Sequence, residues 1–322
     1  MSTTAEKKPQ SKAKETAIGF VTGGLAACGA VTFTNPWEVV KTRLQLQGEL
    51  VRAGALSKAD RPYHNSFQAL KVVLQHEGIR GAQRGLSVAY LYQICLNGSR
   101  LGLYEPVHQG IIQTFNLTSD SSIVASGVFS GAFAGVVGAV LGSPLYLIKT
   151  RRQAYSPVFN NVGHQHEMNS AFSTLVGIYK KEGIRGIYRG ADAAMARAGV
   201  GSAVQMPVYM MGKDVLLKKF GFHDTFSTHF ATSMFTGVLV CLAMNPFDVI
   251  STRMYNQGVD ASGKGLLYKS SPDCFFKIVK IEGVRGLYKG FLAHYLRIGP
   301  HTTLMFVFLE QLKKIYANNF AT

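Results

Sequence analysis

One short pattern occurs three times along the chain and constrains the fold more than any other feature. In each copy a proline ends a mostly apolar run, and polar or charged residues follow it at fixed offsets. The prolines are 144 − 36 = 108 and 246 − 144 = 102 residues apart: Pro36, Pro144 and Pro246. A second pattern ends in glycines with spacings of 105 and 100 residues: Gly85, Gly190 and Gly290. Two patterns in one register predict three similar structural units.

Each unit is predicted to contain two membrane-spanning helices. The first apolar run, residues 16–35, would be about 30 Å long as a helix, which is enough to cross the hydrocarbon core. Further apolar runs predict spans over 86–112, 123–143, 191–217 and 226–245, and a sixth span follows Gly290. Short segments with helical apolar spacing predict surface helices at 66–76, 171–179 and 274–279. The expected fold class is an all-α membrane protein with six transmembrane helices in three pseudo-symmetric repeats.

The expected boundaries follow from these elements. Residues 1–15 form a flexible, lysine-rich tail without an apolar segment, so neither a secretory signal nor a typical transit peptide is visible. The repeats are expected at 16–113, 122–217 and 226–318. The loops within each repeat are rich in Lys and Arg, whereas residues 113–122 contain neither. The loops within the repeats should therefore lie on the side of the membrane that retains positive charge.

The composition argues against other classes of protein. A formal net charge of +16 is compatible with binding to nucleic acid, to membrane phosphate or to anionic substrates. However, 47 % hydrophobic and 16 % charged residues favour a polytopic membrane protein over a soluble, nucleic-acid-binding scaffold. The four cysteines show no CxxC spacing, so neither a disulfide framework nor a zinc site is indicated. No catalytic, P-loop or metal-ligand spacing is present, so the chain is expected to be no enzyme and to need no cofactor or metal.

The repeated proline-x-acid-x-x-base-x-base pattern, followed each time by acid-Gly and base-Gly, resembles the mitochondrial carrier family. The resemblance extends over about residues 16–318. It implies six tilted helices around a central cavity, with short surface helices on the matrix side. It also implies a monomer in the inner mitochondrial membrane with both termini in the intermembrane space, and transport by alternating access.

The resemblance assigns a gate of ion pairs on the matrix side. In the family, the acid after the proline of one repeat pairs with the base of the next repeat, which here joins Glu38 to Lys149 and Asp248 to Lys41. Pairs within one helix, such as Glu38 with Lys41, would leave Asp248 and Lys149 without partners. The arrangement of charges therefore favours pairing between helices.

The third contact of this gate departs from the family pattern. It would join Tyr146 and Ser251, which are both uncharged, so no charge is left without a partner. Gln45 and Gln153 match the glutamines that brace the gate in the family, whereas Tyr255 replaces the third glutamine. Two ion pairs and a neutral contact predict a weakened matrix gate.

A second gate is implied at the opposite, cytoplasmic end. Its residues follow the glycines Gly85, Gly190 and Gly290 by about 20 positions. The family pairing would join Glu105 to Lys213 and Glu310 to His108, leaving Lys313 opposite Met210. This gate is expected to be incomplete and sensitive to pH, because His108 must be protonated to pair fully.

Residues that break the threefold symmetry are candidates for substrate binding. Tyr92, Arg197 and Arg297 stand seven residues past the three glycines, and Arg100 lies about 12 Å further along its helix. An unpaired arginine within a span is expected to face water or an anion, and arginine suits bidentate carboxylate binding. The full candidate set is Arg100, Arg197, Arg297, Tyr92, Gln93, Asn97 and His301. His301, one turn after Arg297, would either carry a proton or act only as a hydrogen-bonding residue.

The resemblance implies a substrate class but leaves alternatives open. The arginine trio is typical of the family's dicarboxylate and keto-acid carriers, and the Leu96–Pro106 stretch, together with these arginines, resembles carriers of oxaloacetate. The expected substrates are oxaloacetate and related small dianions, with sulfate as a further candidate. Ala198 replaces a polar residue that many keto-acid carriers have. A 2-oxoglutarate/malate carrier, a phosphate carrier or a proton-leak member of the family therefore remain alternatives, as do exchange and proton symport.

Lipid is the remaining expected partner. Each Gly of the second pattern follows a base and opens a helix, where exposed backbone amides bind phosphate. In the family such sites hold cardiolipin, which assigns a lipid-binding role to Arg84, Gly85, Arg189, Gly190, Lys289 and Gly290. The alternative is a plain glycine turn. No nucleic-acid partner is expected.

Overall fold

The computed structural model describes residues 12–51, 61–159, 162–166, 170–221, 225–260 and 262–320. This part of the chain is helical and contains no β-strand, apart from two isolated bridges. Within it, six long helices carry the fold: α1 (Lys12–Leu46), α3 (Leu86–Phe115), α4 (Asp120–Ala154), α6 (Ala191–Phe220), α7 (Phe226–Asn256) and α9 (Phe291–Phe320). Three shorter helices alternate with them: α2 (Ser66–Ala82), α5 (Ala171–Ile187) and α8 (Ser271–Glu282), the last followed by the 3₁₀ turn η1 (Val284–Tyr288). The predicted all-α class and the predicted short helices are confirmed, and each short helix is longer than its apolar spacing indicated.

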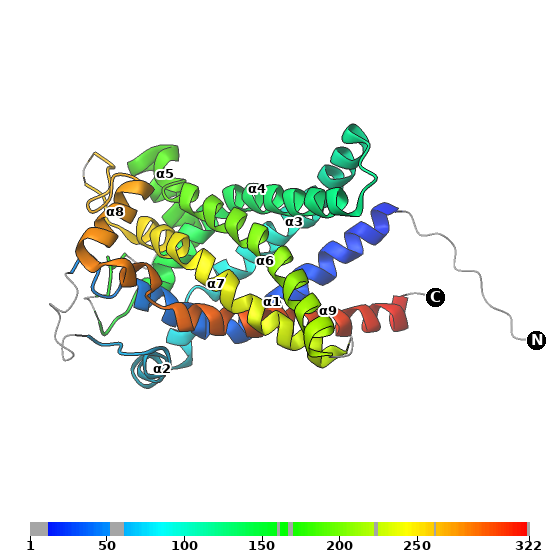
Figure 1. The fold of residues 1–322 in the computed structure, drawn as a ribbon. Helices are drawn as coiled ribbons and strands as arrows, with labels where there is room; N and C mark the ends of the chain where they lie inside the picture. Colours follow the sequence, from blue (N-terminus) through cyan, green and yellow to red (C-terminus); the bar gives the residue numbers. More distant parts are fainter. Residues whose placement is uncertain are drawn as a thin grey trace, which may run out of the picture.

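The long helices form a ring in chain order. Each contacts the next, and α9 contacts α1, so the ring is closed. The short helices α2, α5 and α8 lie at one end of the ring, on the left in Figure 1, whereas the start of α1 and the end of α9 lie at the other end. We call these the short-helix end and the terminal end. Helices α1, α4 and α7 also contact one another, and their proline-following segments carry the predicted gate residues.

Every long helix continues through a proline. A proline removes one backbone hydrogen bond and bends a helix without necessarily ending it. The prolines within the long helices are Pro36, Pro106, Pro144, Pro207, Pro246 and Pro300. The apolar runs therefore end at a proline, but α1, α4 and α7 carry the polar residues that follow on further helical turns.

Two of the described helices are long and apolar enough to cross a membrane by composition alone, α4 and residues Thr232–Asn256 of α7. The remaining long helices carry more charged and polar residues. Large apolar side chains are nevertheless exposed along several of them, including Leu25 and Phe33 on α1 and Phe129 on α4. So many exposed apolar side chains indicate that the outer surface of the long helices contacts something other than water.

Glycines explain why the second sequence pattern repeats. Gly78, Gly183 and Gly283, after the acids, have φ of 65°, 65° and 76°. The glycines that open α3, α6 and α9, Gly85, Gly190 and Gly290, have φ of 75°, 79° and 72°. Residues with a Cβ rarely adopt these angles. Two such turns in each repeat reverse the chain between the short helix and the next long helix.

The buried core lies at the short-helix end. Three apolar clusters each join elements of more than one repeat, and one of them contains Val40 of α1, Val73 of α2, Ala154 of α4 and Ala293 of α9. The buried apolar side chains therefore hold the three repeats together at the end of the ring where the predicted gate residues lie.

Candidate functional site

Two buried ion pairs join the long helices at the short-helix end. Lys149 Nζ of α4 lies 2.6 Å from Glu38 Oε1 of α1, and Lys41 Nζ of α1 lies 2.8 Å from Asp248 Oδ2 of α7. All four side chains are buried. The pairing between helices that the charge pattern predicted therefore forms. Since a buried charge is costly without a partner, these pairs favour the arrangement in which α1, α4 and α7 meet.

The predicted third contact, between Tyr146 and Ser251, is replaced by an aromatic cluster. Ser251 Oγ donates to the backbone oxygen of Asp248 within α7, at 3.0 Å. The Tyr146 ring packs between Tyr92 and Tyr255, with ring centroids 5.2 and 5.3 Å away. Contact between α4 and α7 is thus made by packed aromatic rings.

Cations lie over the rings of this cluster. Lys149 Nζ is 4.9 Å from the centroids of both Tyr92 and Tyr146, and the Arg197 guanidinium is 5.4 Å from that of Tyr146. A cation over an aromatic face is stabilised by about 0.5–2 kcal/mol. The neutral third contact is therefore electrostatically coupled to the ion pair beside it.

The residues predicted to brace the gate make three different contacts. Gln45 Nε2 donates to Asp248 Oδ2 at 2.8 Å, so it joins the gate directly. Gln153 Nε2 donates to Asn35 Oδ1 at 3.0 Å, next to the proline of α1. The hydroxyl of Tyr255 lies 3.0 Å from that of Ser143, at the equivalent position of α4.

The two arginines predicted to be unpaired contact the gate carboxylates. Arg297 Nε is 3.3 Å from Glu38 Oε1, and Arg197 Nε is 3.8 Å from Asp248 Oδ1. The sequence prediction was wrong on this point, because residue spacing does not show that the arginines of α6 and α9 reach the acids of α7 and α1. Each gate carboxylate therefore faces one lysine and one arginine.

Three further substrate candidates have described contacts close to these arginines: Tyr92, Gln93 and His301. Arg197 Nη2 lies 3.5 Å from the hydroxyl of Tyr92. Both ring nitrogens of His301 have neighbours: Nε2 lies 3.2 Å from Gln93 Nε2, and Nδ1 lies 3.3 Å from Thr34 Oγ1. Asn97 is half-buried further along α3. The structure describes the backbone of Arg100 on α3 but not its side chain, so the prediction for this arginine lies outside the described side chains.

At the terminal end, the two predicted gate carboxylates make contacts within their own helices, whereas His108 contacts the neighbouring helix. Glu105 Oε1 accepts from Gln109 at 2.8 Å within α3, and Glu310 Oε1 pairs with Lys314 at 3.0 Å within α9. His108 Nδ1 lies 3.0 Å from Ser126 Oγ of α4. The Lys313 side chain lies outside the described part, and for Lys213 the predicted pairing stays a prediction. Glu105 and Glu310 are exposed, so this end differs sharply from the buried pairs at the other end.

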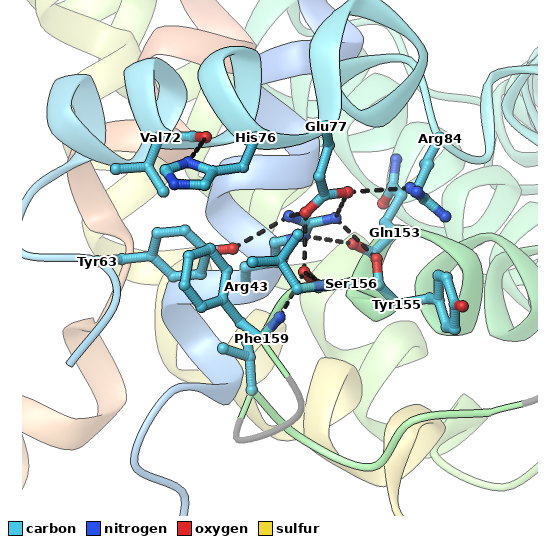
Figure 2. A network of polar contacts seen from close by, with 12 residues as sticks. Arg43, Tyr63, Val72, His76, Glu77, Arg84, Gln153, Tyr155, Ser156 and Phe159 are labelled. Atoms are coloured by element: carbon cyan, nitrogen blue, oxygen red, sulfur yellow. Dashed lines mark hydrogen bonds and ion pairs between the residues drawn. The ribbon is translucent and has the colours of Figure 1, made fainter. Parts of the chain in front are cut away.

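A polar network anchors each short helix, and Figure 2 shows the one in the first repeat. Arg43 binds Glu77 through two contacts, Nη1–Oε1 at 2.5 Å and Nη2–Oε2 at 2.9 Å. Arg84 Nε and Ser156 Oγ donate to the same carboxylate at 3.2 and 2.8 Å. Arg43 also donates to the hydroxyl of Tyr63 at 3.0 Å. A bidentate, buried pair of this kind fixes α2 against the end of α1.

The same arrangement recurs in the other repeats. Glu182 lies 2.8 Å from Arg189, and Glu282 binds Arg253 and lies 2.6 Å from Lys289. The bases Arg84, Arg189 and Lys289, predicted to face lipid, therefore each contact the acid seven residues earlier. The repeated seven-residue spacing of acid and base is the sequence signal for this network, and it was missed in the prediction of lipid contacts.

Acid should weaken the network around Glu77. Burial by itself raises the pKa of Glu77, but the hydrogen bonds and charge of Arg43 outweigh it and hold the pKa below the ordinary 4.5. A carboxyl with a lowered pKa stabilises the fold fully above its ordinary pKa and loses that contribution as pH falls through the lowered value. We expect Glu77→Gln to lower the free energy of unfolding by about 3 kcal/mol at neutral pH, with a difference that shrinks below pH 4.5. Chemical unfolding of the purified protein at a series of pH values checks this, and a difference that does not depend on pH would contradict it.

Comparison with known proteins gives consistent matches. The family model described as "Mitochondrial carrier protein" matches three segments, residues 12–114, 120–220 and 222–320. The "Mitochondrial oxaloacetate transport protein" of Saccharomyces cerevisiae is 48 % identical, over 92 % of this chain and 89 % of the relative. "Mitochondrial citrate transporter E" of Aspergillus niger is 47 % identical, over 92 % of both chains. The human "Mitochondrial 2-oxoglutarate/malate carrier protein" is 36 % identical, over 97 % of this chain and 95 % of the relative.

Proposed function

The chain belongs to the mitochondrial carrier family, and on that premise we propose that it carries oxaloacetate and related small dianions by alternating access. Members of this family are transport proteins of the mitochondrial inner membrane, and two relatives at 48 % and 47 % identity are named for transport of oxaloacetate and citrate. The proposal assigns to this chain the substrate named for the relative at 48 % identity.

The observation that supports a dicarboxylate is the pairing of the two arginines with two carboxylates. Arg297 and Arg197 contact Glu38 and Asp248 at 3.3 and 3.8 Å. Each arginine thus already lies within ion-pair distance of a carboxylate oxygen in this conformation. A free dicarboxylate offers the same chemical groups, so it would replace both protein carboxylates at the arginines. Arginine is well suited to this exchange, because its planar group binds carboxylates bidentately.

Replacement of the gate carboxylates would connect binding to gate opening. With substrate on the arginines, Glu38 and Asp248 each keep only a lysine as cationic partner. The substrate's binding free energy would offset part of the cost of separating the buried pairs. The exposed terminal end, with Glu105 and Glu310 on the surface, supports a conformation that is open there and closed at the short-helix end.

The membrane arrangement is part of the proposal. The closed ring of six long helices supports six spans around a central cavity, although only two of the described helices are long and apolar enough by composition alone. The arginines and polar residues of the other helices would then face the cavity rather than lipid. The start of α1 and the end of α9 both lie at the terminal end, which supports placing both termini in the intermembrane space. We expect the carrier to act as a monomer.

Cardiolipin binding is proposed for the surface of the short-helix end. A cavity of about 910 Å³ lies between the end of α1, the start of α2 and the start of α9. Its lining includes Arg61, Arg285, Lys289 and Gly290. Bases beside the opening turn of a helix favour a phosphate group. Because Lys289 pairs with Glu282, we expect the backbone amides of this turn, rather than the Lys289 side chain, to donate to the phosphate.

Uptake into proteoliposomes tests the proposed function. Purified protein would be reconstituted and offered labelled oxaloacetate, malate, 2-oxoglutarate, citrate, sulfate and phosphate, with and without a pH gradient. We expect saturable uptake of oxaloacetate, and inhibition of that uptake by unlabelled malate. Uptake confined to citrate, 2-oxoglutarate or phosphate would overturn the substrate assignment, and a proton leak without anion uptake would overturn the carrier function.

A further inference from the structure

His294 is a buried histidine with no counterpart in the other two repeats. It lies on α9, four residues after Gly290, and its side chain is fully buried. The equivalent positions after Gly85 and Gly190 are Ala89 and Ala194. Symmetry-breaking residues at this depth are candidates for a role in transport, and His294 is not among the candidates predicted from the sequence.

The hydrogen bonds of His294 define which ring nitrogen carries the proton. Asn245 Nδ2 donates to the backbone oxygen of Leu287 at 2.7 Å, which fixes the orientation of the amide. Asn245 Oδ1 then faces His294 Nδ1 at 3.1 Å and accepts its hydrogen. The other nitrogen, Nε2, therefore carries a lone pair. It is buried and has no hydrogen-bond partner among the described residues.

His294 also changes the gate around it. In the first repeat the equivalent of Asn245, Asn35, accepts from Gln153, and in the second repeat Ser143 contacts Tyr255. In the third repeat His294 occupies this place on Asn245. Gln45, the symmetry-related brace, donates to Asp248 instead. The imidazole is thus part of the structural asymmetry of the gate.

The charges that face this ring come from four helices. They are Asp248 on α7, Lys41 on α1, Arg197 on α6 and Arg297 on α9 itself. Three cations and one carboxylate surround the ring, so a proton on Nε2 would add a fourth positive charge. A dianion bound to Arg197 and Arg297 would cancel two of these charges and favour that proton.

We propose that His294 Nε2 binds one proton when a dianion occupies Arg197 and Arg297, so that the anion and the proton cross the membrane together. The proton from solution bonds to the Nε2 lone pair as substrate binds, and it leaves on the other side as substrate dissociates. No other bond forms or breaks. This inference rests on the proposed function, since it requires a transported dianion.

The geometry favours His294 over His301, the histidine expected from the sequence. Gln93 Nε2 faces His301 Nε2 at 3.2 Å and Thr34 lies at Nδ1, so both ring nitrogens of His301 are already engaged. A proton on His301 Nε2 would point at the amide nitrogen of Gln93 and require that amide to turn over. His294 Nε2 needs no such rearrangement.

Transport with a trapped pH indicator tests the proposal. Wild-type protein, His294→Ala and His294→Gln would be reconstituted with the membrane potential clamped, and oxaloacetate uptake and proton entry would be followed together. Alanine occurs at the equivalent positions of both other repeats, and glutamine keeps a donor for Asn245. For wild type, a gradient of one pH unit should change the accumulation of oxaloacetate about tenfold per proton carried. Both variants should exchange oxaloacetate at equal pH but show no proton entry and no response to the gradient.

The control is His76→Ala, which removes an exposed imidazole on α2 and should leave proton coupling unchanged. Proton coupling that persists in both His294 variants, or wild-type oxaloacetate uptake without proton entry, would overturn the proposal.

If neither variant transports, proton uptake from a weakly buffered detergent solution on adding oxaloacetate decides the question. Wild type should take up a proton and His294→Gln should not; equal proton uptake would overturn the proposal. Absence of any oxaloacetate uptake by wild type would instead contradict the proposed function.

Discussion

Replacing Arg297 by alanine is expected to abolish oxaloacetate uptake, while the protein still inserts into membranes. The substitution removes one of the two cations proposed to bind the substrate carboxylates. Loss of two charge-assisted hydrogen bonds should slow uptake at limiting substrate by about 100-fold or more. The gate itself should persist, because Glu38 keeps its contact with Lys149 at 2.6 Å. Uptake of labelled oxaloacetate and the yield of membrane-inserted protein are the two measurements.

Two further variants make this result specific. Arg297→Lys keeps the charge but loses the planar group, so we expect partial uptake. Arg80→Ala removes an exposed arginine on α2 and should have no effect on uptake. If Arg297→Ala transports at close to the wild-type rate, Arg297 is not part of the substrate site.

Replacing Asp248 by alanine is expected to cause the largest loss of stability. Its carboxylate accepts from Lys41 and Gln45, each at 2.8 Å, and faces Arg197 at 3.8 Å. Without this carboxylate, the buried cations Lys41 and Arg197 lose the negative charge that they face. Removing one partner of a buried ion pair costs about 3–5 kcal/mol. Thermal unfolding of the purified protein should show a strongly lowered Tm, with little folded protein at growth temperature.

A matched surface pair provides the control. Asp214 pairs with Lys218 at 3.0 Å, but these side chains are 63 % and 75 % exposed. Exposed pairs contribute about 1 kcal/mol or less, so Asp214→Ala should barely change the Tm. The double variant Lys41→Met with Asp248→Ala should recover part of the lost stability, because it removes one of the buried cations as well. Equal Tm values for Asp248→Ala and Asp214→Ala would contradict the assignment of Asp248 to a buried pair.

The sequence predicted the features of the fold that follow from equivalent positions in the three repeats. Three copies of one pattern at similar spacing place equivalent residues at one depth. The resemblance to the family implied the pairs Glu38–Lys149 and Lys41–Asp248, the charge pattern favoured them, and the structure contains both. The short helices followed from apolar spacing. The repeated glycines marked turns, and the structure shows positive φ at each of them.

Contacts that depend on side-chain size and helix packing could not be inferred. Tyr146 was expected to meet Ser251, but the ring of Tyr255 lies against it, and spacing alone does not show which ring fills a shared space. Similarly, the reach of Arg297 to Glu38 depends on how α9 packs against α1. Arg84 was expected to bind lipid because a base beside an opening helix suits phosphate, and that assignment stays a prediction. Its contact with Glu77 depends on the fold and could not be inferred.

His294 shows a further limit of symmetry arguments. The candidates predicted from the sequence stand between seven and fifteen residues past the glycines, whereas His294 lies four residues past Gly290. Its position breaks the symmetry and is visible in the sequence. Its proposed role, however, depends on a hydrogen bond to Asn245 and on an Nε2 without a partner among the described residues, which a sequence does not reveal.

The most direct measurement is uptake of labelled oxaloacetate into liposomes containing unlabelled oxaloacetate, for wild type and Arg197→Gln. Glutamine keeps hydrogen-bonding groups but removes the charge that faces Asp248. A dianion site built on the two arginines predicts saturable exchange by wild type and its loss in Arg197→Gln. Absence of exchange by wild type, or undiminished exchange by Arg197→Gln, would contradict such a site.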